Sequence, residues 1–226
     1  MAEGEEKKIH SIGIIGGTGK EGKGLAFCWA KAGYQVFIGS RQVEKAQTAV
    51  EEVLGKLGGK ADVSGMTNVE AAEKADLAVI TVPFSVHRET LAGLKPLLQG
   101  KIVVDVTVPL VPPKVTRVQM PPAGSASLEA QEILGEGAQV ATAFQNISHE
   151  NLFEGRTVDC DVLVCSNSKA ARKTVVELVQ AAGLSGFDAG PLSNSMVVEG
   201  LTSILIGLNI QFGVQSSGIR ITGIPR

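Results

Sequence analysis

The chain has 226 residues, of which 44% are hydrophobic and 19% are charged, and its formal net charge is −2. This composition is typical of a folded globular protein and excludes a disordered, collagen-like or coiled-coil chain. The balance of 21 basic and 23 acidic residues excludes a general attraction to nucleic acid or to an anionic membrane, so any phosphate binding must be local.

Short apolar runs alternate with helical patterns along most of the chain. In chain order, the first half predicts a strand at residues 9–15, a helix at 20–32, a strand at 34–38, a helix at 44–57, a strand at 61–65, a helix at 68–75, a strand at 77–82, a helix at 86–98 and a strand at 101–106. The second half predicts a helix at 127–134, strands at 139–144 and 162–165, a helix at 169–182, a strand at 186–189 and a long last helix. Parallel strands need crossover connections, which here are helices that bury both faces of the sheet. We therefore expect an α/β fold: a doubly wound, Rossmann-type parallel sheet in residues 1–150 and a small α/β extension in residues 151–226.

Two further segments stand out in the second half of the chain. Residues 108–124 contain five of the nine prolines, which predicts a long loop, and long loops within compact domains are often functional. Residues 200–219 carry no charge and match a membrane span in length, but their Ser, Thr, Asn and Gln side chains make a lipid-facing helix too polar. Their helical apolar spacing predicts a helix that is buried in the core or in a subunit interface, and we expect a homo-oligomer, such as a dimer.

Glycine is the residue type whose distribution says most about function in this sequence. Six of the 27 glycines fall between Gly13 and Gly24, and we interpret this cluster as a phosphate cradle. Within it, Gly17 to Gly22 reads G-x-G-x-x-G between a predicted strand and a predicted helix, which is the context that the dinucleotide-binding motif requires. Such glycines allow a sharp turn and let the backbone approach a pyrophosphate at the N-terminus of the helix. The alternative is a structural glycine-rich turn.

The end of the second predicted strand indicates which dinucleotide binds. An Asp or Glu there would favour NAD, because it accepts hydrogen bonds from the ribose and repels a 2′-phosphate. The sequence instead has Ser40 and Arg41, followed by Lys45. A hydroxyl and two cations can bind the 2′-phosphate, so we predict NADP. The alternative is a solvated start of the next helix.

Residues that could donate a proton to a carbonyl substrate are few. His10 precedes the first strand, whereas His87 and His149 follow strand ends and are more typical of solvated or helix-start histidines. The only tyrosine is Tyr34, which excludes a Tyr-x-x-x-Lys mechanism. The three cysteines form no disulfide framework and no zinc spacing, so we expect no metal site and no catalytic side chain. An acceptor that needs no acid or base fits this sequence, as in hydride transfer between two bound cofactors.

Four segments resemble a known family, the F420-dependent NADP reductases. They are residues 16–26 (GGTGKEGKGLA), 39–46 (GSRQVEKA), 188–195 (DAGPLSNS) and 218–222 (GIRIT), and the resemblance extends from about residue 12 to residue 222. It implies hydride transfer between C4 of the nicotinamide and C5 of the deazaflavin, with NADP(H) and F420 stacked in a cleft between the two units. It further implies that the protein is a homodimer or a larger oligomer.

Matching positions imply the following site. The NADP contacts would be Gly17, Thr18, Gly19, Lys20, Glu21, Ser40, Arg41, Lys45, Val82, Val108 and His149. Phe84 matches a position near the nicotinamide that is usually Trp, and Gln145 matches a position near the deazaflavin that is often His. The basic partners of the acidic F420 tail could be any of Arg88, Lys114, Arg117 or Arg220.

Two other functions stay open at the level of sequence. One is an NADPH-dependent reductase of another acceptor, such as a flavin, a quinone or a metal chelate; the other is an NADP-binding protein without turnover. The charged first eight residues lack the apolar segment of a signal peptide, so a cytoplasmic location is expected. No nucleic-acid partner and no membrane partner is expected.

Overall fold

The structure is a computed structural model that describes residues 8–154 and 159–224. Its strands are β1 (Ser11–Ile15), β2 (Gln35–Ser40), β3 (Val63–Thr67), β4 (Leu77–Ile80), β5 (Ile102–Asp105), β6 (Gln139–Thr142), β7 (Asp161–Ser166) and β8 (Ser185–Asp188). Its α-helices are α1 (Lys20–Lys31), α2 (Val43–Lys56), α3 (Asn68–Lys74), α4 (Phe84–Leu98), α5 (Ala126–Leu134), α6 (His149–Glu154), α7 (Lys169–Ala181) and α8 (Ser195–Phe212), which a 3₁₀ turn (Leu192–Asn194) precedes.

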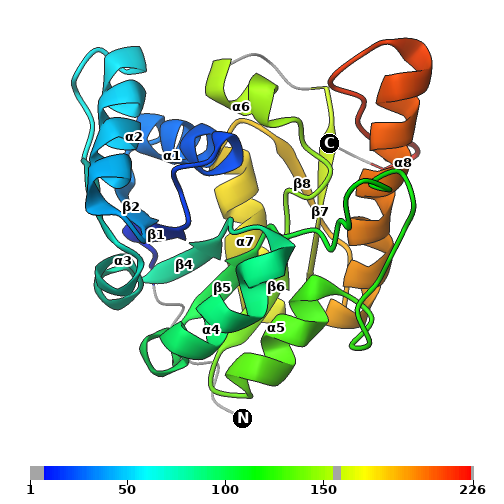
Figure 1. Cartoon of the computed structure of the whole chain (residues 1–226), viewed down its shortest axis with the longest axis horizontal. Coiled ribbons are helices and arrows are strands. Elements are labelled where there is room, and N and C mark those ends of the chain that lie inside the picture. Colours follow the sequence, from blue (N-terminus) through cyan, green and yellow to red (C-terminus); the bar gives the residue numbers. More distant parts are fainter. Residues whose placement is uncertain (1–7, 155–158, 225–226) are drawn as a thin grey trace.

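The eight strands form one sheet in the order β3-β2-β1-β4-β5-β6-β7-β8. Strands β1 to β6 are parallel, β7 pairs antiparallel with β6, and β8 runs parallel to β7. Helices α1, α2 and α7 pack on one face, and α3, α4 and α5 pack on the other (Figure 1). The predicted doubly wound α/β sheet is confirmed. The sheet continues past residue 150 into β7 and β8, and a division into two domains stays a prediction.

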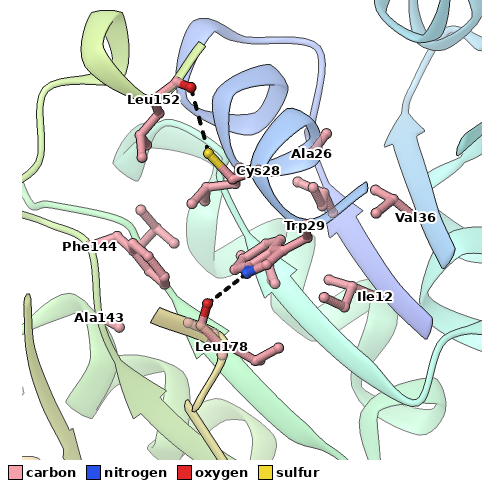
Figure 2. Close-up of a cluster of buried hydrophobic side chains, with 14 of the residues drawn as sticks. Ile12, Ala26, Cys28, Trp29, Val36, Ala143, Phe144, Leu152 and Leu178 are labelled. Atoms are coloured by element: carbon pink, nitrogen blue, oxygen red, sulfur yellow. Dashed lines mark hydrogen bonds between the residues drawn. The ribbon is translucent and has the colours of Figure 1, made fainter. Parts of the chain in front are cut away.

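The core joins the first crossover helix to the last part of the sheet. Trp29 of α1 is fully buried, and its indole Nε1 donates a hydrogen bond to the backbone oxygen of Leu178 at 2.9 Å (Figure 2). Its ring meets that of Phe144 edge to face, with the centroids 5.7 Å apart. A buried indole needs a hydrogen-bond partner, so this contact fixes α1 against α7 in one orientation. The glycine-rich loop that precedes α1 is thereby anchored to a rigid helix.

Helix α8 and the proline-rich loop pack against each other (Figure 1). Added Cβ atoms at Gly200 and Gly207 would approach the loop side chains of Met120 and Thr116, and the Ser203 hydroxyl donates to the Arg117 carbonyl at 3.4 Å. Small residues on one face of α8 thus provide the surface on which the loop rests. By length and composition alone, residues 192–212 could also cross a membrane, a property they share with core helices of soluble proteins.

Candidate dinucleotide-binding site

The glycine-rich loop after β1 is a tight backbone turn. Gly16 adopts φ +74°, a conformation that L side chains rarely adopt, and a Cβ there would lie 2.5 Å from Val82. A Cβ on Gly22 would lie 2.5 Å from the Gly17 Cα, so α1 packs directly on the loop. The Gly17 amide donates to the Gly39 carbonyl at 3.0 Å and the Gly16 amide to Asn68 Oδ1 at 3.0 Å. These contacts fix the loop at the carboxyl ends of β1 and β2.

Gly19 differs from the other motif glycines because a Cβ there would meet nothing within 4 Å. It is the N-cap residue of α1 and makes no side-chain cap, so the first amides of the helix have no capping side chain as acceptor. Such amides, with the positive end of the helix dipole, form an anion site. The exposed Lys20 adds a cation beside it. The loop therefore fits a pyrophosphate.

Two glycines of the cluster have another role. A Cβ on Gly13 would lie 2.5 Å from the Ala71 carbonyl oxygen of α3, and one on Gly24 would lie 2.8 Å from Leu152 Cβ of α6. Both glycines allow a helix to pack closely. The interpretation of the whole cluster as a phosphate cradle is therefore wrong for these two residues.

A hollow of about 220 Å³ opens beside the loop. Five residues of the predicted site line it together: Thr18, Ser40, Arg41, Lys45 and Val82. The Ser40 hydroxyl oxygen accepts from the amide of Gln42 at 3.1 Å, which leaves the hydroxyl proton to donate to a ligand. Both basic side chains are exposed at the start of α2. A second hollow of about 390 Å³ adjoins the first and shares five of its lining residues: Ser40, Arg41, Asn68, Val86 and Thr90.

Glu21, in the first turn of α1, carries an unusual carboxyl group. Its Oε1 is buried and makes no hydrogen bond in the described part of the chain. Burial raises the pKa of this carboxyl from 4.5 to about 8. The side chain is therefore mostly protonated at neutral pH and adds little negative charge near the anion site.

The remaining predicted contacts lie at the carboxyl ends of neighbouring strands. Val82 follows β4, Phe84 is the first residue of α4, Val108 follows β5 and Gln145 follows β6. Gln145 is 5% exposed, and its Nε2 donates to the backbone oxygen of Asp105 at 2.6 Å. These residues share the edge of the sheet on which the glycine loop lies, which is where ligands bind in such folds.

Helix α6 is absent from the sequence-based prediction. It begins at His149 and lies against α1, where a Cβ on Gly24 would come within 3.5 Å of the His149 carbonyl. The predicted contact His149 is thereby placed beside the first helix rather than at a strand end. A six-residue helix is too short to show a periodic pattern in the sequence. In the structure, the close approach of Gly24 shows that α6 packs on α1.

The other histidines differ in their environments. His10 lies at the amino end of β1, on the far edge of the sheet, as expected. His87 lies in the first turn of α4, which agrees with the expected helix-start position, but it is fully buried rather than solvated, and its Nε2 lies 2.8 Å from Asp105 Oδ2. The carboxylate of Asp105, at the end of β5, is a partner that no local sequence pattern indicates.

The possible partners of an acidic tail fall into two groups. Arg88 donates to Glu129 at 2.8 Å, and Arg220 pairs with Asp159 and Asp161. Lys114 and Arg117 are exposed on the proline-rich loop. All three cysteines are buried and free, and no His, Cys, Asp and Glu grouping within residues 8–154 and 159–224 could hold a metal ion.

Comparison with known proteins agrees with this geometry. Residues 11–109 match the family model described as NADP oxidoreductase, coenzyme F420-dependent. The chain is 41% identical to the F420-dependent NADP reductase of Methanocaldococcus jannaschii, over 94% of this chain and 98% of that protein. It is 40% identical to the F420-dependent NADP reductase of Methanothermobacter thermautotrophicus, over 96% and 97% of the two chains.

More distant similarities concern the fold. A solved structure from Arthrobacter sp. FB24, a candidate F420-dependent NADP reductase, superimposes with a TM-score of 0.80 at 22% identity and covers 96% of this chain and 100% of that one. A metalloreductase of Rattus norvegicus is 27% identical over 86% of this chain, which spans 37% of that protein. The similarity to the two F420-dependent NADP reductases, over nearly the whole of each chain, shows that the chain belongs to the family of F420-dependent NADP reductases.

Proposed function

We propose that this oxidoreductase transfers a hydride reversibly between C4 of the nicotinamide of NADPH and C5 of the deazaflavin F420, directly from ring to ring. The observation that carries the proposal is a tight glycine loop at an uncapped helix start, with a basic hollow beside it, on the same sheet edge as Val82, Phe84 and Val108. Nearly full-length identity of about 40% to F420-dependent NADP reductases supports the same activity.

The residues suit NADP in two places. The open space at Gly19 and the uncapped start of α1 would hold the pyrophosphate, with Gly17, Thr18, Lys20 and Glu21 around it. In the basic hollow, Ser40, Arg41 and Lys45 would hold the 2′-phosphate. A guanidinium fork and an ammonium group recognise a phosphate by charge-assisted hydrogen bonds and ion pairing, whereas NADH offers only a neutral hydroxyl at that position.

The nicotinamide and the deazaflavin would meet at the strand ends. Val82 and Val108 would contact NADP there, His149 would contact it from the start of α6 beside α1, and Phe84 and Gln145 would contact the ring pair. Tyr34, the only tyrosine, lies at the amino end of β2, on the opposite edge of the sheet, and cannot act as a proton donor here. The contribution of the protein would be to align two rings and to exclude water, which direct hydride transfer needs.

Anaerobic mixing of the protein with NADPH and F420 tests the proposal. We expect loss of the deazaflavin absorbance at a rate that increases with protein concentration, and much slower loss with NADH. The matched reactions replace F420 with a flavin, a quinone or a ferric chelate. Turnover with one of these acceptors and none with F420 would support the alternative reductase, and tight NADP binding without any turnover would support a binding protein.

We further propose a homodimer in which α8 contributes to the interface. Its side chains Val197, Ile204, Ile210 and Phe212 are between 52% and 70% exposed in the single chain. Several large apolar side chains exposed along one helix are typical of an interaction surface. Light scattering should give twice the mass of the chain, and Phe212→Glu should give the monomer mass; a monomeric wild-type protein would contradict this proposal. The cytoplasmic location and the lack of nucleic-acid and membrane partners stay predictions.

A further inference from the structure

Three strand ends around the proposed ring site are tied to one another by hydrogen bonds. The Thr107 hydroxyl donates to the Val82 carbonyl at 3.3 Å, which joins the end of β5 to the end of β4. The Gln145 side chain donates to the Asp105 carbonyl at 2.6 Å, which joins the end of β6 to β5. Between them, the Thr107 amide donates to Asp105 Oδ1 at 3.0 Å. Asp105 is therefore the common point of a network that sets the spacing of Val82, Val108 and Gln145.

The other oxygen of the Asp105 carboxylate contacts a buried histidine. Asp105 and His87 both have fully buried side chains, and Asp105 Oδ2 lies 2.8 Å from His87 Nε2. Burial by itself lowers the pKa of the His87 imidazole, but attraction to Asp105, with smaller contributions from Glu129 and Glu199, outweighs it and raises the pKa. His87 lies in the first turn of α4, and its ring centroid is 6.0 Å from that of Phe84. Through this ring contact, the His87–Asp105 pair connects Phe84 to the network of strand ends.

Hydride transfer depends strongly on the spacing of these residues. The reacting carbons must approach to about 3–3.5 Å, and a displacement of about 1 Å lowers the rate by as much as about 100-fold. We propose that Asp105, oriented by His87, is a positioning residue for hydride transfer, which holds the strand ends at the spacing that the stacked rings require. This inference rests on the proposed function. Asp105 would act through its neighbours and would not itself contact either ring.

The substitution Asp105→Asn tests the role with little change in shape. Asparagine keeps the oxygen that accepts from Thr107 and removes the charge that pairs with His87. The matched control is Asp76→Asn, the same change at a carboxylate that ties strand ends at the amino edge of the sheet. Asp76 Oδ2 accepts from the Ser11 amide at 3.1 Å and the Ser11 hydroxyl at 3.0 Å, far from the site.

Single-turnover reduction of F420 by NADPH, the KM for NADPH and the melting temperature are measured for each protein. For Asp105→Asn we expect a 10- to 100-fold lower rate of the chemical step, an unchanged KM within about threefold, and a larger primary deuterium isotope effect from C4-deuterated NADPH. Asp76→Asn should keep the wild-type rate and isotope effect, even if its melting temperature falls equally.

Some results would overturn the inference while leaving the proposed function intact. A wild-type rate for Asp105→Asn would do so, as would an equal loss of rate in both variants, which would indicate a general loss of folding. If Asp105→Asn does not fold, His87→Gln breaks the same pair from α4, and a wild-type rate in that variant would also overturn it. Failure of the wild-type protein to reduce F420 would instead contradict the proposed function.

Discussion

Two alanine substitutions in the glycine motif should have opposite consequences. At Gly22 the added Cβ would lie 2.5, 2.7 and 2.8 Å from three backbone atoms of Gly17, whereas ordinary contacts are 3.4–4 Å. The helix and the loop must therefore separate by roughly 1 Å, since no flexible side chain can yield. Overpacking of this kind costs up to about 3 kcal/mol, and the gain in helix propensity offsets about 1 kcal/mol. We expect Gly22→Ala to lose about 2 kcal/mol, or roughly 4–8 °C in melting temperature.

At Gly19 the same methyl group meets nothing within 4 Å, and φ is −73°, which alanine adopts readily. Gly19→Ala should melt within about 3 °C of the wild type. Alanine is a poorer N-cap than glycine, but it also lowers the conformational entropy of the unfolded chain, and the two effects nearly cancel. The substitution should nevertheless raise the Kd for NADPH at least about tenfold, because the methyl group fills the space assigned to the pyrophosphate. Calorimetric melting and fluorescence titration with NADPH measure both quantities. Wild-type NADPH affinity in Gly19→Ala would refute the assignment of the loop.

Two further predictions concern charge. Arg41→Glu should weaken NADPH binding by about 100-fold through loss of the phosphate contact and added repulsion, while NADH affinity changes little; equal effects on both cofactors in a titration would contradict a 2′-phosphate site. Glu21→Gln should become increasingly more stable than the wild type between pH 4.5 and about 8, because the buried carboxyl of Glu21 stays protonated in the folded chain over this range while it ionises in the unfolded one. Above pH 8 the difference in melting temperature should level off, and a difference that does not vary with pH would show that Glu21 titrates normally.

The order of strands and helices could be predicted because buried parallel strands appear as short apolar runs between amphipathic helices. The motif at Gly17, Gly19 and Gly22 could be located because its chemistry is local in sequence. By contrast, the roles of Gly13 and Gly24 depend on helices that are distant in sequence, so the glycine count could not separate packing from binding.

The His87–Asp105 pair could not be predicted for a similar reason. The two residues are 18 positions apart and meet only because α4 packs against the strand that follows it. Helix α6 was missed because a helix of six residues gains its stability from packing on α1 rather than from its own pattern.

Isotope labelling distinguishes direct transfer of a hydride from NADPH to F420 from any route through the solvent. NADPH that carries deuterium at both C4 positions is oxidised by the protein with F420 in ordinary water, and the reduced deazaflavin is analysed by mass spectrometry. We predict one deuterium at C5 of every reduced F420, and none when unlabelled NADPH reacts in D₂O once exchangeable N–H and O–H positions are washed out. Deuterium at C5 from the solvent, or its absence after reaction with labelled NADPH, would contradict direct hydride transfer.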